Sequence, residues 1–225
     1  MPTVLPVVAG DRLVGSSILV GGHKHRLLFS TVLHALGGSS QIRVAIPPHG
    51  GDLNIPQVYP PSAEMRVWEM SVVATDPFAD VVILSTPPHE SHPTPIVRIA
   101  DRPFGLAVGA DAVVLGYPFA PIGSVLETWT SCTVTAHAKR QLVPGLLLDE
   151  LVLSAVSHPG SSGSAVVGKA DGVLHGIVRG ALAPPELLKI GEIPVATDTS
   201  VTLATSAHIV HDLLMFAKAQ IDTLP

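Results

Sequence analysis

The chain has 225 residues and a formal net charge of −5, and 47% of its residues are hydrophobic while only 14% are charged. The negative charge and the absence of a Lys/Arg cluster exclude the electrostatic footprint of a nucleic-acid-binding protein, and they give no support for binding to an anionic membrane. A single cysteine, Cys132, excludes an intrachain disulfide and fits a reducing compartment.

A chain of this length forms one all-β domain or two small ones. Its 20 glycines and 21 prolines favour many short strands joined by tight turns. The longest uncharged stretches are interrupted by glycine, so none is typical of a transmembrane helix. The first residues lack a basic segment followed by a long apolar core, so we expect no secretory signal and a cytoplasmic location.

Short strands fill the first half of the chain. Runs rich in apolar and β-branched residues predict strands at 4–8, 16–20, 26–32, 41–46, 65–75 and 81–84. The segment 86–95 carries four prolines, which fit neither a strand ladder nor a helix, so we expect a linker there. His89 and His92 lie in this linker, and without a helix they do not share a face, so we expect no metal site.

Two polar residues of the first half stand at the ends of strands. His34 closes the segment that contains the strand at 26–32, and Asp80 directly precedes the strand at 81–84. Each has a structural interpretation on its own, because a histidine in such a place is often structural and an aspartate often caps a turn. Asp80 is also placed where a partly buried carboxylate orients a histidine. Asp76 is the alternative, although it lies farther from the strand and precedes a proline.

The second half repeats the pattern of short strands. They are predicted at 112–115, 125–136, 151–156, 165–167, 173–178 and 200–204. Each half therefore offers about six strands, which is enough to close a small barrel. A helix is expected last, because apolar residues recur at helical spacing after Thr205 and Ser206, either of which is able to cap it. We expect two six-stranded antiparallel β-barrels, at 1–95 and 96–204, and a C-terminal helix at 205–225.

The loop Ser157-His158-Pro159-Gly160-Ser161-Ser162-Gly163-Ser164-Ala165 lies between two apolar runs. Small residues in such a place allow backbone N–H groups to point at an anion, and they expose a nucleophile such as Ser162. When a carbonyl is attacked, it becomes an oxyanion, and one N–H donor aimed at it is worth roughly 3–4 kcal/mol. An ordinary Ser/Gly loop is the competing interpretation of these residues alone.

Four ordered segments resemble the motifs of trypsin-like serine proteases, and bacterial HtrA-type domains are the most similar in pattern. Residues 15–34 resemble "G-S-G-F-L-V…L-T-x-A-H", and 80–84 resemble "D-L-A-L-L". Residues 108–118 resemble "V-G-D-x-V-x-x-x-G-x-P", and 158–178 resemble "N-P-G-N-S-G-G…G-x-V-x-G-I". The order His34, Asp80, Ser162 is the order of the chymotrypsin branch. The resemblance implies two barrels of the chymotrypsin type with the site between them.

The resemblance also implies a role for each matching residue. Ser162 is the nucleophile, and His34 is the base that accepts its proton and later protonates the leaving amine. Asp80 fixes the tautomer of the imidazole and stabilises its protonated form. The backbone N–H groups of Gly160 and Ser162 form the oxyanion hole. The implied reaction is hydrolysis of a peptide bond in a protein or peptide substrate, with no metal and no cofactor.

The sequence departs from the family pattern beside the nucleophile. Ser164 and Ala165 replace a glycine and a proline. Ser161 stands where secreted trypsins have an aspartate, so we expect no activation by N-terminal cleavage. Arg179 takes a position usually held by a small residue, where it either contacts Asp80 or narrows the substrate groove.

By the same resemblance, two segments form the specificity pocket. The expected substrate-binding residues are Val156, Ser157, His158, Val178, Arg179, Gly180 and Ala181. Val156 lies where trypsins have an acidic pocket floor, so we expect poor cleavage after basic residues and a preference for small or medium apolar side chains. An acidic preference is the alternative, supported by Arg179, His158 and Ser164.

The sequence leaves two alternatives to a serine endopeptidase. One is a catalytically weak or inactive module that binds peptides or partners through a protease fold, for which Arg179 is the best support. The other is a protease domain controlled by a bound regulatory protein or a fused domain, which the apolar composition fits.

Overall fold

The computed structural model describes residues 3–46, 65–88, 96–123, 125–182, 188–190, 193–195 and 200–223. The loop expected at 47–61 and the histidines of the proline-rich segment, His89 and His92, lie outside these residues. Everything below concerns the described part of the chain.

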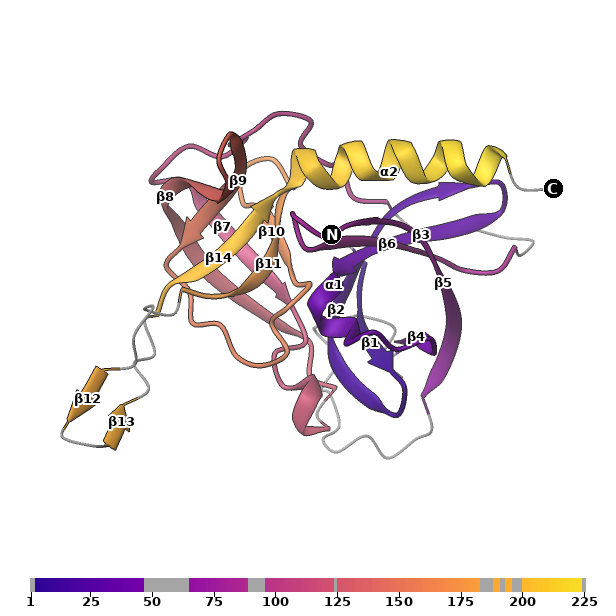
Figure 1. Cartoon of the computed structure of the whole chain (residues 1–225), viewed down its shortest axis with the longest axis horizontal. Coiled ribbons are helices and arrows are strands. Elements are labelled where there is room, and N and C mark those ends of the chain that lie inside the picture. The colour runs from indigo at the N-terminus through magenta and orange to yellow at the C-terminus, as the bar shows by residue number, and fades with distance from the viewer. Residues whose placement is uncertain are drawn as a thin grey trace.

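Two closed antiparallel barrels of six strands each form the body of the molecule (Figure 1). The N-terminal barrel has the order β1-β2-β3-β6-β5-β4 and contains β1 (Val4–Ala9), β2 (Arg12–His23), β3 (Arg26–Val32), β4 (Ile42–Ile46), β5 (Arg66–Asp76) and β6 (Val81–Ser85). The C-terminal barrel has the order β10-β11-β14-β9-β8-β7 and contains β7 (Asp111–Gly116), β8 (Thr128–Val143), β9 (Leu146–Leu153), β10 (Ala165–Gly168), β11 (Leu174–Ala181) and β14 (Thr202–Ser206). The expected double barrel with a C-terminal helix is confirmed.

Three short elements and one long helix complete the described chain. One helical turn, α1 (Leu33–Leu36), follows β3, and a 3₁₀ turn, η1 (Ala120–Ile122), follows β7. A separate hairpin of β12 (Leu188–Ile190) and β13 (Ile193–Val195) extends from the C-terminal barrel (Figure 1). Helix α2 (Ala207–Asp222) continues directly from β14.

The continuous apolar run of β6 is explained by burial on both faces of the strand. Val82 and Leu84 point into the N-terminal barrel beside Phe29. Val81 and Ile83 point the other way, into a cluster shared with the C-terminal barrel and α2. Neighbouring residues of a strand face opposite sides, so a strand with two packed faces needs apolar residues at every position. The two barrels are therefore joined by a common core.

Helix α2 starts from the C-terminal barrel and lies across the N-terminal one, against β5, β6 and β2 (Figure 1). Its buried face consists of Ala207, Val210, Leu214, Ala217 and Ile221, which recur every three or four residues. Ser206 occupies the N-cap position, but its hydroxyl makes no bond to the helix backbone and lies 3.0 Å from Nδ1 of His208 instead. The helix connects the two barrels on the outside.

A buried carboxyl group lies where the barrels meet. The hydroxyl of Tyr117, which has no exposed surface, is 3.1 Å from Oε2 of Glu127 and 3.3 Å from the carbonyl oxygen of Val4. Burial raises the pKa of Glu127 to about 7, although the hydrogen bond from Tyr117 acts to lower it. Burial also raises the pKa of Tyr117, so its hydroxyl remains a donor.

We expect Glu127 to make the protein less stable as the pH rises. Its pKa is about 7 in the folded state against a reference value of 4.5, so the folded state binds the proton more tightly and unfolding releases it. The free energy of unfolding should therefore fall by about 2–3 kcal/mol between about pH 5 and pH 8 relative to Glu127→Gln, whose amide keeps the neutral shape. Chemical denaturation of both proteins at several pH values measures the difference, and parallel curves would contradict the shift.

Candidate active site

His34 lies on α1, directly after β3, and the backbone of this turn is held by the residue that precedes the neighbouring strand β6. The N–H of His34 donates to Oδ1 of Asp80 at 2.8 Å, and the N–H of Leu33 donates to the carbonyl oxygen of Asp80 at 3.1 Å. The imidazole Nδ1 lies 2.5 Å from Oδ2 of the same carboxylate. Asp80 therefore fixes both the backbone and the ring of His34.

Asp80 ends the connection between β5 and β6 in a left-handed conformation with φ of 60°. Aspartate adopts this conformation more readily than most residues because its side chain hydrogen-bonds locally. Asp76 begins the same connection, and its Oδ1 accepts the N–H groups of Phe78 and Ala79 at 3.0 and 2.9 Å. The alternative Asp76 thus stabilises the turn, and Asp80 is the carboxylate that contacts His34.

Ser162 lies on the loop between β9 and β10, which is held against the N-terminal barrel. Its carbonyl oxygen accepts the N–H of Ser16 at 2.9 Å. The next residue, Gly163, has φ of 84°, and a Cβ atom there would overlap the carbonyl oxygen of Ser16. Glycine is required at this position for both reasons, so the loop is fixed where it presents Ser162.

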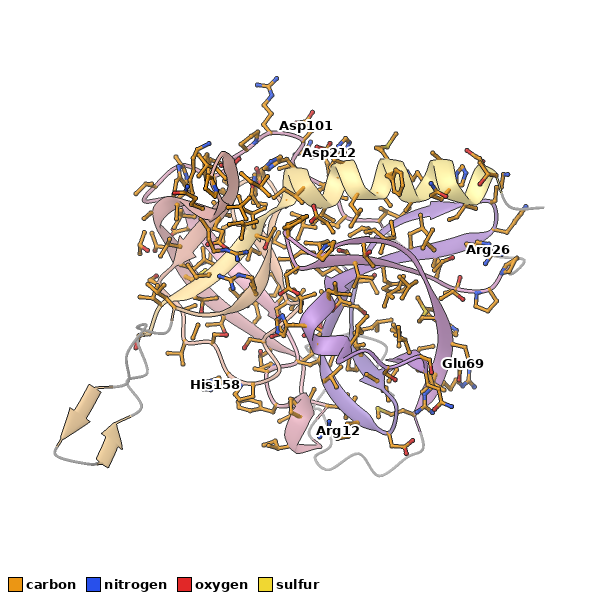
Figure 2. The ribbon with its side chains drawn as sticks, viewed as in Figure 1. Arg12, Arg26, Glu69, Asp101, His158 and Asp212 are labelled. Atoms are coloured by element: carbon orange, nitrogen blue, oxygen red, sulfur yellow. The ribbon has the colours of Figure 1, made fainter. Side chains whose placement is uncertain are left out.

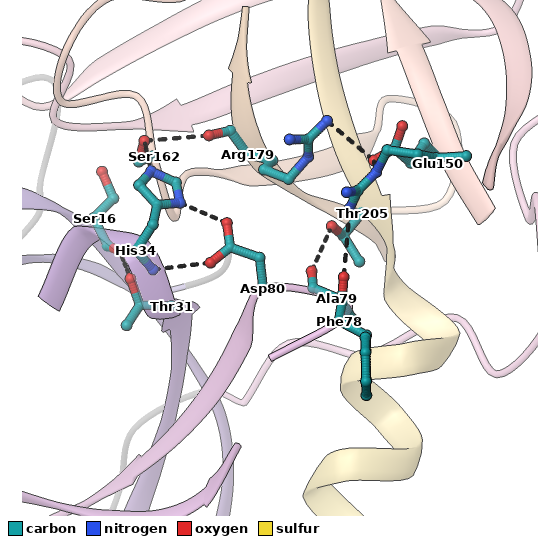
Figure 3. A network of polar contacts seen from close by, with 11 residues as sticks. Ser16, Thr31, His34, Phe78, Ala79, Asp80, Glu150, Ser162, Arg179 and Thr205 are labelled. Atoms are coloured by element: carbon teal, nitrogen blue, oxygen red, sulfur yellow. Dashed lines mark hydrogen bonds and ion pairs between the residues drawn. The ribbon is translucent and has the colours of Figure 1, made fainter. Parts of the chain in front are cut away.

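The three side chains form one chain of polar contacts, with His34 between Asp80 and Ser162 (Figure 3). Nε2 of His34 is 3.0 Å from Oγ of Ser162. The Ser162 hydroxyl also lies 3.3 Å from the carbonyl oxygen of Arg179 on β11. The carboxylate is mostly covered, with 19% of its side chain exposed, while half of the His34 side chain is open to solvent. The structure thus brings together the residues proposed from the sequence.

The first of the two expected oxyanion donors, the N–H of Gly160, is engaged within the nucleophile loop. The N–H of Gly160 donates to the carbonyl oxygen of His158 at 2.9 Å, and the N–H of Ser161 donates to the same oxygen at 2.9 Å. Gly160 is itself enclosed, because a Cβ atom there would lie 2.6–2.7 Å from Pro121 and from the carbonyl oxygens of Tyr117 and Pro118. In this conformation the amide of Gly160 is committed to a tight turn within its own loop.

Beside the nucleophile loop lies a cavity of about 330 Å³ in the C-terminal barrel. Four of the expected substrate-binding residues line it: Val156, Ser157, His158 and Val178. Arg179, Gly180 and Ala181 do not. Three threonines that were not expected from the sequence also line it: Thr128, Thr130 and Thr202. Thr128 and Thr130 are two residues apart and therefore share one face of β8, and this spacing is the feature of the sequence that could have predicted their role.

The side chain of Arg179 points away from Asp80, so the contact with Asp80 considered from the sequence is wrong. Its guanidinium lies 3.2 Å from Oε1 of Glu150, a carboxylate that is only 3% exposed (Figure 3). Nε of Arg140 lies 2.8 Å from the same oxygen. A buried carboxylate needs such partners, because leaving an ion unpaired in the interior is costly. Arg179 is therefore a partner of Glu150, with only its carbonyl oxygen directed at Ser162.

This cluster also supports the turn that carries Asp80. Arg140 approaches the carbonyl oxygen of Phe78 at 3.5 Å, and the hydroxyl of Thr205 donates to the carbonyl oxygen of Ala79 at 3.1 Å (Figure 3). Both donors belong to the C-terminal barrel, whereas the turn belongs to the N-terminal one. In the described part of the chain, no group of three or more His, Cys, Asp or Glu side chains is arranged to hold a metal ion, and no helix has the length and apolar character needed to cross a bilayer.

A double β-barrel with a serine, a histidine and an aspartate at the junction defines the class of the trypsin-like fold. The model of the trypsin-like peptidase domain family matches residues 15–177 of the chain. The chain therefore belongs to the trypsin-like peptidase domain family. No protein with a curated function matches it.

Solved structures share the fold at low identity. A mutant, inactive form of Rv3671c from M. tuberculosis H37Rv superposes with a TM-score of 0.64 at 24% identity, over 99% of this chain and 88% of that one. The HtrA-type protease AlgW with a tripeptide gives 0.64 at 22%, over 96% and 60% of the two chains. The MamO protease domain from Magnetospirillum magneticum gives 0.64 at 19%, over 94% and 95%.

Proposed function

We propose that this chain is a serine endopeptidase that hydrolyses peptide bonds through an acyl-enzyme. The observation that carries the proposal is the continuous contact from Asp80 through His34 to Ser162, with 2.5 Å and 3.0 Å between the paired atoms. A hydroxyl is a weak nucleophile until a base accepts its proton, and a base works best when a third group orients it. The family to which the chain belongs supports the same reaction class.

The reaction follows from these positions. Oγ of Ser162 attacks the carbonyl carbon and passes its proton to Nε2 of His34, while Asp80 stabilises the resulting imidazolium. The imidazolium then protonates the leaving amine as the C–N bond breaks, which leaves an ester on Ser162. Water, deprotonated by His34, attacks that ester and releases the acid and the free hydroxyl. The first proton transfer uses Oγ of Ser162 and Nε2 of His34, which are 3.0 Å apart.

Stabilisation of the oxyanion requires one change in the nucleophile loop. We assign the N–H groups of Gly160 and Ser162 to the oxyanion, and the first of them is bonded to His158 in this structure. Turning the peptide unit between Pro159 and Gly160 would free this donor. This occupied donor also favours the second candidate function, a catalytically weak module that binds peptides in the same groove.

Labelling with a fluorophosphonate separates the two candidates. The wild-type protein should become labelled on Ser162, as located by mass spectrometry of its peptides. His34→Ala should react about 10²–10⁴-fold more slowly, because it lacks the base. A folded wild-type protein that binds peptides but takes up no label would support the binding module and overturn the endopeptidase.

We expect cleavage after small or medium apolar residues. The cavity beside Ser162 has Val156 and Val178 among its walls, and no acidic residue lines it. A Lys or Arg side chain would lose its hydration there without gaining a partner. Each methylene added to the substrate side chain should raise kcat/KM by about fourfold, since its burial is worth about 0.8 kcal/mol, until the cavity is filled. Profiling on a peptide library tests this, and dominant cleavage after Lys or Arg would contradict it.

The acidic preference considered from the sequence loses its main support. It relied on the guanidinium of Arg179, which is paired with Glu150 and does not line the cavity. His158 remains at the rim, where its ring lies 5.6 Å from that of Phe119. The same peptide library tests the acidic preference. Cleavage after Glu would require a cation in the cavity wall, and apart from His158 the described lining residues supply none.

A further inference from the structure

A second hollow, of about 300 Å³, adjoins Ser162, and among the described residues none lines both this hollow and the specificity cavity. His34 and Ser162 line this hollow and do not line the first one. Its remaining walls are built from both barrels, with Leu13 and Ala35 on one side and Pro121 and Pro159 on the other. A substrate that crosses Ser162 therefore has room on both sides of the bond to be cleaved.

The position of His34 tells which part of the substrate enters this hollow. The imidazole must protonate the leaving amine, so the amine and the residues attached to it lie on the side that the ring faces. The specificity cavity, from which His34 is absent, receives the acyl part. The second hollow is thus the binding site for the first residues of the leaving peptide, an assignment that rests on the proposed function.

Among the described residues that line this leaving-side hollow, Arg12 is the one with a permanent charge. Arg12, the first residue of β2, is exposed there beside η1, at the lower end of the junction between the barrels (Figure 2). The walls next to it are apolar or uncharged apart from His34. Figure 2 shows His158, which lines the specificity cavity, on the opposite side of η1 from Arg12.

Arg12 makes no ion pair within the described part of the chain, although acidic groups are close in sequence. Its neighbour Asp11 is fully exposed, and the Asp11 carboxylate lies 3.8 Å from the guanidinium of Arg43. Arg43 in turn donates to the carbonyl oxygen of Gly10. Asp11 lies in the turn between β1 and β2, and the cation recorded near its carboxylate is that of Arg43.

We propose that the leaving-side hollow selects substrates with a carboxylate within the first two residues after the cleaved bond, and that Arg12 is the residue that binds it. A guanidinium presents paired N–H donors that match a carboxylate, and such charge-assisted bonds are stronger than neutral ones. The apolar walls on either side hold the peptide backbone near the guanidinium. An Asp or Glu side chain and the C-terminal carboxylate of a short peptide supply the same chemistry.

The test compares quenched fluorescent peptides that share one acyl part and differ only after the cleaved bond. The leaving parts are Ala-Glu-amide, Ala-Lys-amide, Ala-Ala-amide and Ala-Ala with a free carboxylate. For wild-type protein we expect kcat/KM to be about three- to tenfold higher for Ala-Glu-amide than for Ala-Lys-amide, the range typical of a partly exposed charged pair. The ratio should shrink between about 20 mM and about 0.5 M salt, because screening weakens the attraction.

Variants of Arg12 identify the group responsible. The ratio should fall to near one in Arg12→Gln and invert in Arg12→Glu. Using the ratio within each variant removes any general effect on turnover. The control is Arg102→Gln, because Arg102 is exposed and its neighbour in sequence, Asp101, lies at the opposite end of the molecule from Arg12 in Figure 2. A wild-type ratio near one together with no gain from a free chain-end carboxylate, or the same preference in wild type and Arg12→Gln, would overturn the proposal.

Two comparisons with Ala-Ala-amide separate the sources of the carboxylate. A gain for Ala-Ala with a free carboxylate over Ala-Ala-amide shows that the hollow accepts a chain end, and a gain for Ala-Glu-amide shows that it accepts a side chain. Either gain, if it depends on Arg12, supports the proposal. The absence of both overturns it.

A binding measurement keeps this inference separate from the proposed function. In Ser162→Ala, fluorescence anisotropy of the same peptides, labelled at the acyl end, should show about three- to tenfold tighter binding of the Glu peptide than of the Lys peptide. The difference should disappear when Arg12→Gln is added. Tight binding with this preference and no hydrolysis by wild type would overturn the endopeptidase and uphold the carboxylate site, whereas hydrolysis without the preference would do the reverse.

Discussion

Ser162→Ala should abolish peptide hydrolysis while leaving the fold intact. We expect kcat to fall by about 10⁶-fold, because without the hydroxyl neither the acyl-enzyme nor the proton transfer to His34 is available. Within the described part of the chain, the hydroxyl contacts His34 and the carbonyl oxygen of Arg179, and neither residue is fully buried. The loop is held instead by the backbone bond between Ser16 and Ser162 and by Gly163, neither of which changes.

Hydrolysis of the best library peptide and thermal unfolding of the same preparations provide the two readouts. Ser131→Ala is a matched control, since this exposed serine on β8 belongs to neither hollow. It should keep wild-type activity. Unchanged hydrolysis by folded Ser162→Ala would show that another group is the nucleophile, and loss of the folded state would show that Ser162 has a structural role.

Glu150→Ala should destabilise the protein by about 2–4 kcal/mol. Removing one partner of a buried ion pair leaves the other charge uncompensated, which typically costs about 3–5 kcal/mol, and the partial exposure of both arginines reduces that cost. Arg140 and Arg179 share one oxygen of this carboxylate, so both lose their partner at once. For a chain of this size the midpoint of thermal unfolding should fall by about 5–12 °C.

The matched control is Asp222→Ala at the end of α2. That carboxylate also meets two cationic groups, with His23 at 2.8 Å and Lys24 at 3.2 Å, but half of its side chain is exposed. Pairs in solvent are typically worth less than about 1 kcal/mol, so this variant should remain close to wild type. Equal stability of Glu150→Ala and Asp222→Ala would show that burial does not strengthen the pairing of Glu150.

The sequence by itself determined the barrels and the three contacting residues of the site. A strand is recognised in the sequence by alternating apolar residues or, as in β6, by a continuous apolar run. The positive φ angles of Gly163 and Asp80 depend on the type of the single residue. The order of His34, Asp80 and Ser162 could be matched to a family because each stands beside such a local feature. These signals need no knowledge of distant neighbours.

Only the tertiary structure decided which partners the charged residues take. The motifs place Arg179 next to the site of the nucleophile, yet its guanidinium pairs with Glu150. Glu150 on β9 comes close to Arg179 on β11 because both strands pair with β14. Thr128 and Thr130 reach the specificity cavity for the same reason, because barrel closure sets which faces meet. Arg12 is distant from Ser162 in the chain and lines the same hollow because the two barrels dock. The partner of a long charged side chain depends on which groups lie within reach and on how deeply they are buried. The residues next to it in the sequence do not determine either of these.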